Sequence, residues 1–130
     1  MADIYNIGAS TTQITLEATI STFGLAATTV NLIDVAAGTI IQLPINDDGN
    51  GNILPKQNIG DHTLLTGKRL QIFTKVTLTG DDAPTRANNA AATTGSYTID
   101  GGDDGVKAYT DADTTYIDPN VFVEQLIDMQ

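Results

Sequence analysis

The chain has no cysteine and no tryptophan among its 130 residues. Without cysteine it has neither disulfide bonds nor thiolate metal ligands, which excludes the small secreted scaffolds that depend on disulfides. Aromatic residues make up only 5% of the chain. A stacking platform for sugars or bases would therefore have to be built from tyrosines.

Basic residues are also scarce, with six Lys and Arg against 16 Asp and Glu, a net charge of −10 and a pI near 4.1. This charge repels nucleic acid and anionic membrane surfaces. No apolar run approaches the roughly 18 residues that span a bilayer, and no secretory signal follows Met1. We expect a soluble protein without nucleic-acid partners or membrane insertion. The sequence does not determine the compartment, and an extracellular or particle-associated location reached by a non-classical route is one candidate.

Aspartate and threonine are in excess, with 14 Asp and 20 Thr. Aspartate favours turns and helix caps, whereas threonine favours strands, and residues that favour helices are correspondingly few. A chain of this length forms one hydrophobic core without further stabilising links. We therefore expect a single all-β domain over residues 1–130.

The clearest pattern lies in residues 67–80, where Leu70, Ile72, Thr74, Val76 and Leu78 alternate with polar side chains. This period of two predicts a half-buried strand of an antiparallel sheet. Similar patterns predict strands at residues 13–23, 28–33, 39–45, 96–99 and 106–110.

These strands predict an antiparallel β-sandwich of seven to nine strands, jelly-roll-like or immunoglobulin-like in its layering. A partly closed β-barrel is the alternative. Residues 119–129 form either a last strand or a helix capped by Asp118, and the Val-Phe-Val sequence favours the strand.

Four segments are predicted to lie outside the main strands. Residues 46–52 (NDDGNGN) predict a turn, and residues 53–66 predict mainly a connection. Residues 81–95 predict a long flexible loop, because residues 85–94 contain no large apolar side chain. Residues 1–12 predict an N-terminal arm or a short strand.

Carboxylates gather on both sides of the predicted hairpin turn at residues 100–105. Asp100, Asp104 and Asp111 occupy positions one, five and twelve of a calcium loop, but Gly102 stands at position three and the flanks resemble strands. An EF-hand is therefore excluded. Calcium bound in a sandwich by Asp100, Asp103, Asp104 and Asp111 is one hypothesis, and a solvated acidic turn is the other.

Other candidate ligands have less support from the pattern. Asp48, Asn50 and Asn52 carry suitable oxygens, but Ile53 stands where a calcium loop needs glycine. Tyr97 and Tyr109 flank the hairpin and could be cross-strand neighbours, which suggests either a carbohydrate contact or structural packing.

No catalytic constellation is evident. His62 is the only histidine and has no activated nucleophile in a recognisable motif, so we interpret it as a turn residue. The glycines near Lys68 do not have the spacing of a phosphate-binding loop. We expect a protein that is not an enzyme and needs no cofactor, calcium being the one candidate.

These observations favour a self-associating structural subunit of a fibre, a virion, or a phage-like or injection particle. Its contact segments would be residues 1–12 and 81–95, joined to neighbouring subunits by added strands. The alternative is a ligand-binding module for carbohydrate or calcium that uses residues 100–118 with Tyr97 and Tyr109. A small hydrolase using paired aspartates is a third class.

Overall fold

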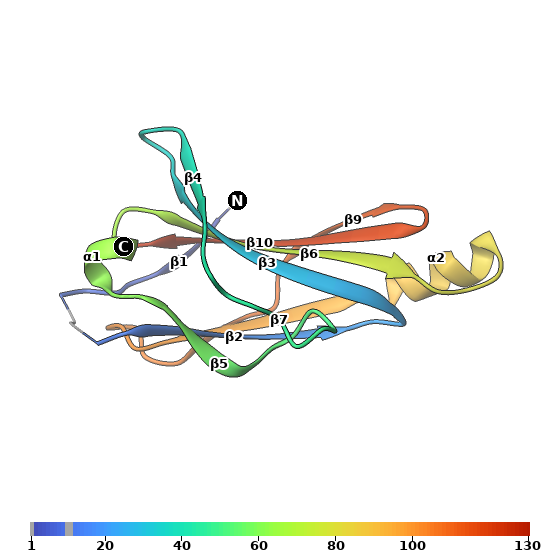
Figure 1. The fold of residues 1–130 in the computed structure, drawn as a ribbon, viewed down its shortest axis with the longest axis horizontal. Coiled ribbons are helices and arrows are strands. Elements are labelled where there is room, and N and C mark those ends of the chain that lie inside the picture. Colours follow the sequence, from blue (N-terminus) through green and yellow to red (C-terminus); the bar gives the residue numbers. More distant parts are fainter. Residues whose placement is uncertain (1, 10–11) are drawn as a thin grey trace.

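Alternating apolar and polar side chains produce two β-sheets that pack face to face (Figure 1). The computed structural model describes residues 2–9 and 12–130. Its strands are β1 (Asp3–Tyr5), β2 (Ile14–Ser21), β3 (Gly24–Asp34), β4 (Thr39–Gln42), β5 (Ile53–Gly60), β6 (Arg69–Leu78), β7 (Thr94–Asp100), β8 (Lys107–Tyr109), β9 (Asp113–Ile117) and β10 (Asn120–Met129). Its helices are α1 (His62–Leu65) and α2 (Ala83–Ala91).

One sheet has the strand order β1-β10-β6-β3-β4, with β9 also paired to β10, and the other has the order β5-β2-β7-β8. Neighbouring strands are antiparallel except β1, which pairs with β10 in parallel. The β-sandwich is confirmed, and the described residues form no closed barrel. No helix in this part of the chain is long and apolar enough to cross a membrane.

Strand β6 lies at the centre of the larger sheet, between β10 and β3. Leu70, Ile72, Thr74 and Val76 are buried along its inner face, as the period of two predicts. Residues 120–129 form the ten-residue strand β10 beside it, so the strand prediction for the tail is confirmed.

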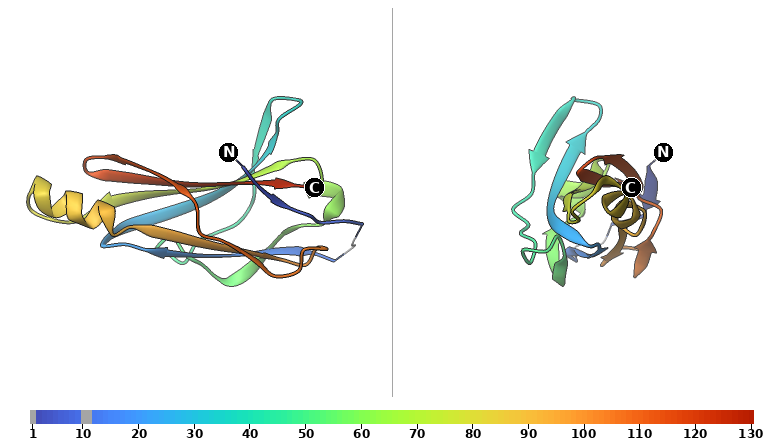
Figure 2. Two further views of the ribbon diagram at one scale, coloured as in Figure 1. Left: turned by 180° about the vertical axis from the view of Figure 1, so that it is seen from behind. Right: turned by 90° about the vertical axis from the view of Figure 1, so that its right-hand side faces the viewer.

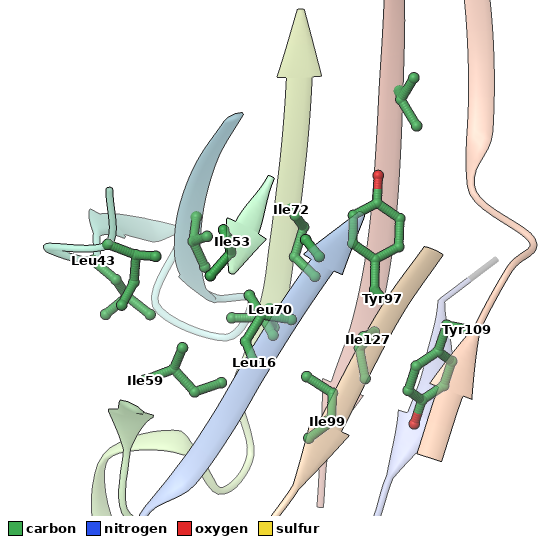
Figure 3. Close-up of a cluster of buried hydrophobic side chains, with 14 of the residues drawn as sticks. Leu16, Leu43, Ile53, Ile59, Leu70, Ile72, Tyr97, Ile99, Tyr109 and Ile127 are labelled. Atoms are coloured by element: carbon green, nitrogen blue, oxygen red, sulfur yellow. The ribbon is translucent and has the colours of Figure 1, made fainter. Parts of the chain in front are cut away.

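The core fills the space between the two sheets (Figure 3). Leu16 and Ile99 come from the smaller sheet, whereas Leu70, Ile72 and Ile127 come from the larger one. Burying each such side chain contributes roughly 1.5–3 kcal/mol. The sheets therefore stabilise one another through apolar contact across the sandwich.

The prediction of a long loop over residues 81–95 is wrong, because residues 83–91 form helix α2. The Asp82 carboxylate accepts a hydrogen bond from the Thr85 amide at 2.8 Å, and Pro84 lies in the first turn. These are the two signals of a helix start. The alanines that follow favour helix even though they offer no large apolar side chain.

The expectation of an N-terminal arm is also corrected. Tyr5 and Ile7 are fully buried, and the β1–β10 pairing is extended by the Ile7 amide donating to the Gln130 carbonyl and the Gln130 amide donating to the Tyr5 carbonyl. The described residues 2–9 therefore belong to the protein's own fold. Residues 1, 10 and 11, which are part of the same predicted segment, lie outside the described residues.

Residues 53–66 are more regular than the predicted connection. They form edge strand β5 and the short helix α1, whose cap is the Asp61 side chain accepting from the Leu64 amide at 3.1 Å. The apolar alternation is weak here because only Ile53 and Ile59 of β5 reach the core.

Candidate functional site

The β3–β4 hairpin rises from the body of the sandwich (Figures 1 and 2). Residues 31–34 of β3 pair with residues 39–42 of β4. The turn is closed by Asp34, whose carboxylate accepts from the Ala37 amide at 3.0 Å and whose carbonyl accepts from Gly38 at 2.8 Å. Gly38 has φ = 70°, a conformation that other residues seldom adopt, so this turn depends on glycine.

The part of the hairpin that follows Asp34 exposes apolar side chains and no charged ones. Val35, Ile40 and Ile41 are 59%, 66% and 55% exposed, and every residue of β4 is exposed. Residues 35–46 contain no charged side chain, although the chain carries a net charge of −10. Large apolar side chains left exposed in one segment mark a candidate interaction site.

Strand β4 also leaves one edge unpaired within the described residues. Three of the other edge strands have protective features: β1 and β8 are three residues long, and β5 contains Pro55, Lys56 and two register shifts against β2. Such features prevent added strands from pairing. Strand β4 (TIIQ) contains no proline, lysine or bulge, and Pro44 comes after its end.

The predicted calcium ligands are placed along the β7–β8 hairpin, which is confirmed by the pairing of Ile99 with Lys107. Asp104 accepts from the Asn6 amide at 2.8 Å and lies 3.7 Å from the Lys107 ammonium. The amide hydrogen bond from Asn6 lowers the pKa of Asp104. This carboxylate therefore joins the hairpin to the segment after β1.

The other carboxylates of this set have different neighbours. Asp100 accepts from the Gly101 amide at 2.7 Å and lies 3.7 Å from the Lys56 ammonium. The Asp103 backbone amide donates to Ile7 at 3.1 Å. Among the described side chains, no three carboxylates or histidines lie close enough together to hold a metal ion. Asp100, Asp103, Asp104 and Asp111 are therefore not brought into one cluster.

Asp111 and Asp3 both accept hydrogen bonds from one buried side-chain amide, that of Gln125. The Gln125 side chain is only 2% exposed, and its Nε2 donates to Asp3 at 2.7 Å and to Asp111 at 3.3 Å. Burial and a hydrogen bond with Asp111 raise the pKa of Asp3, whereas that hydrogen bond lowers the pKa of Asp111. These side chains connect β1, β10 and the β8–β9 connection.

We expect Asp3→Asn to be more stable than the wild type at pH 7, by roughly 2 °C in Tm. A raised folded-state pKa for Asp3 contributes stability below its ordinary value of 3.8, and that contribution is lost as the pH rises. The advantage of the variant should therefore disappear near pH 3. Thermal unfolding at both pH values tests this, with Asp81→Asn, an exposed site, as the control. A variant less stable than the wild type at pH 7 would contradict it.

Tyr97 and Tyr109 are direct cross-strand partners, as expected, but they face the core and are 0% and 5% exposed (Figure 3). The Tyr109 hydroxyl donates to the Ile4 carbonyl at 2.8 Å. Burial raises the pKa of Tyr97 to about 12. Because neither ring has a free face, the carbohydrate-contact hypothesis is corrected in favour of structural packing.

Two further predicted positions have structural roles. Asp48 accepts from the amides of Asn50 and Asn52 at 2.8 and 3.1 Å, so this run forms a self-capped turn. The Asn52 side chain accepts from the Ile20 amide at 2.7 Å and attaches the turn to β2. His62 is the first residue of α1, not a loop residue.

The residues that the sequence prediction missed are those of the projecting hairpin. Strand β4 was predicted as an ordinary strand with Ile40 and Ile41 in the sheet. The feature of the sequence that could have revealed the exposed hairpin is the pair of adjacent isoleucines in a short uncharged run. In a strand, neighbouring side chains point to opposite faces, so at least one of them must leave a one-sided core.

Comparison of the chain with protein-family models, with curated protein sequences and with solved structures finds no match.

Proposed function

We propose that the protein is a structural subunit that associates with further copies of itself through the β3–β4 hairpin, as in a fibre or particle shell. The observation that carries this proposal is the pair Ile40 and Ile41, more than half exposed on an edge strand without protection. An unpaired edge offers backbone donors and acceptors to an incoming strand, and the isoleucines add apolar area.

The charge of the chain supports the choice of this surface. Copies carrying −10 repel one another, and desolvating carboxylates at a contact is costly. A contact made by residues 35–46 avoids the desolvation cost and adds no carboxylate to the interface, because this stretch has no charged side chain. The hairpin thus takes the place of residues 1–12 as the proposed contact segment, whereas residues 81–95 stay a candidate for the surface that receives it.

A ligand-binding function has less support. The two tyrosines proposed for carbohydrate are buried, and three of the four aspartates proposed for calcium, Asp100, Asp104 and Asp111, accept hydrogen bonds from the chain's own amide groups. Measuring the solution mass by light scattering in EDTA and again in millimolar calcium tests whether calcium changes the association. We expect the same solution mass in both buffers.

We expect the wild type to have a concentration-dependent mass above 13.7 kDa, and Ile40→Glu/Ile41→Glu to have a mass of 13.7 kDa. Two carboxylates on an exposed strand leave the core intact but would be buried in the contact. Light scattering over a range of concentrations measures the mass. Val106→Glu is the matched control, since Val106 is 72% exposed outside the hairpin. A wild type that stays at 13.7 kDa at every concentration would refute the proposed function.

A further inference from the structure

Helix α2 lies at one end of the long axis, whereas the hairpin projects from the other half of the molecule (Figures 1 and 2). A hollow of about 250 Å³ lies between α2 and the β9–β10 hairpin. Ala87, Ala90 and Ala91 form its helix side, and Thr114 and Tyr116 form its strand side. Small side chains on the helix leave this space open.

A second hollow of about 220 Å³ adjoins the first and shares Thr114 with it. Thr94, Gly95 and Ala112 are among its lining residues. Neither hollow is lined by an acidic or basic side chain. The two hollows, which share Thr114 as a lining residue, are together called here the α2–β9 groove.

The walls of this groove also offer unpaired strand edges. Within the described residues, β9 is paired on one side only, to β10. Strand β8 pairs with residues 97–99 of β7 and stops short of residues 94–96. An extended segment entering the groove therefore finds free backbone donors and acceptors as well as apolar side chains.

The hairpin and the groove differ in side-chain size, and both lack charged lining residues. The hairpin presents large aliphatic side chains at Val35, Ile40 and Ile41, and the groove is lined by alanine, threonine and glycine beside Tyr116. Both are neutral surfaces on a chain of charge −10. A second copy of this chain is therefore an occupant that the structure itself supplies.

We propose that the β3–β4 hairpin of one copy seats in the α2–β9 groove of the next, an inference that rests on the proposed function and names its receiving surface. The two surfaces are different parts of the molecule, so the contact is heterologous. Repeating a heterologous contact produces a ring if the rotation closes and a filament if it does not. A symmetric hairpin-to-hairpin contact would stop at a dimer.

The test uses two complementary variants. Ala87→Glu/Ala91→Glu blocks the groove and leaves the hairpin intact. Ile40→Glu/Ile41→Glu blocks the hairpin and leaves the groove intact. Ala87 and Ala91 are exposed and one helical turn apart, and glutamate favours helix, so the fold is retained. Asn88→Glu, an exposed position on the same helix that does not line the groove, is the matched control and should associate as the wild type does.

We expect each variant alone to have a mass of 13.7 kDa by light scattering, and an equimolar mixture to have twice that mass and no more. Only one hairpin–groove contact can form in the mixture, which is why growth stops at two chains. If the groove variant alone still assembles, or if the mixture stays at 13.7 kDa, the groove is not the receiving surface. The first of these results leaves the proposed function standing, whereas a monomeric wild type removes both proposals.

A second measurement does not depend on added charge. The chain contains no cysteine, so Ile41→Cys/Ala91→Cys introduces the only two thiols. Under mild oxidation we expect a ladder of disulfide-linked multimers from this variant and no ladder from Ile41→Cys/Asn88→Cys. Equal ladders from both would overturn the proposed contact.

Discussion

Replacing Tyr5 with alanine is expected to lower the free energy of unfolding by about 4 kcal/mol and the Tm by roughly 15 °C. Tyr5 is one of the largest fully buried side chains. Its hydroxyl donates to the Gly105 carbonyl at 2.6 Å and accepts from the Gly102 amide at 3.0 Å. The substitution therefore creates a cavity and also leaves polar groups of the β7–β8 hairpin without partners.

Urea or thermal unfolding measures this effect. Ile4→Ala is the neighbouring control, because Ile4 is 44% exposed and its loss should cost no more than about 0.5 kcal/mol. Equal losses for the two variants would show that β1 does not pack into the core. They would also reopen residues 2–9 as an arm available to other copies.

Gly101→Ala is expected to cost about 3 kcal/mol, the second large effect. Gly101 has φ = 110°, and a Cβ atom placed there would lie 2.4 Å from the Gln13 carbonyl oxygen. Both the backbone conformation and the close approach exclude a side chain. The carbonyl belongs to the backbone just before β2, so it cannot move aside without disturbing the sheet.

The matched control for this prediction is Gly105→Ala in the same hairpin. Gly105 has φ = 63°, but a Cβ atom there would meet nothing within 4 Å. The control should therefore cost about 1 kcal/mol, from backbone conformation alone. Chemical denaturation of both variants separates the two contributions. Equal costs would mean that the approach of Gln13 does not limit this position.

The strands with alternating patterns could be predicted because burial on one face is visible in the sequence itself. Strand β6 has most of its apolar residues at every second position, and burial alternates in the same way along β10, although Phe122 and Gln125 interrupt the pattern in its sequence. The sandwich follows from several such strands, since each must cover its apolar face with another layer. Strand order and the parallel β1–β10 pair could not be predicted, because pairing depends on partners distant in the chain.

Helix α2 was missed because its evidence lies in its cap and not in a stripe of apolar residues. None of its residues is buried. Polar contacts at its surface hold it: Arg86 pairs with Asp118 at 2.7 Å, and Asn89 donates to the Thr79 carbonyl at 2.8 Å. The Asp-Ala-Pro-Thr sequence at its start is a recognisable helix signal.

By itself the sequence determined the all-β composition, the central strand and the absence of thiol chemistry, because these depend on residue type and local period. It favoured a strand over a helix at residues 119–129, and the structure decided between them. Only the tertiary structure decided which apolar residues remain exposed. Ile40 and Ile41 resemble core residues until the strand order places β4 at an edge that rises from the sandwich. The tertiary structure likewise separated the predicted calcium ligands and buried Tyr97, because contacts between segments distant in the chain determine which side chains are exposed.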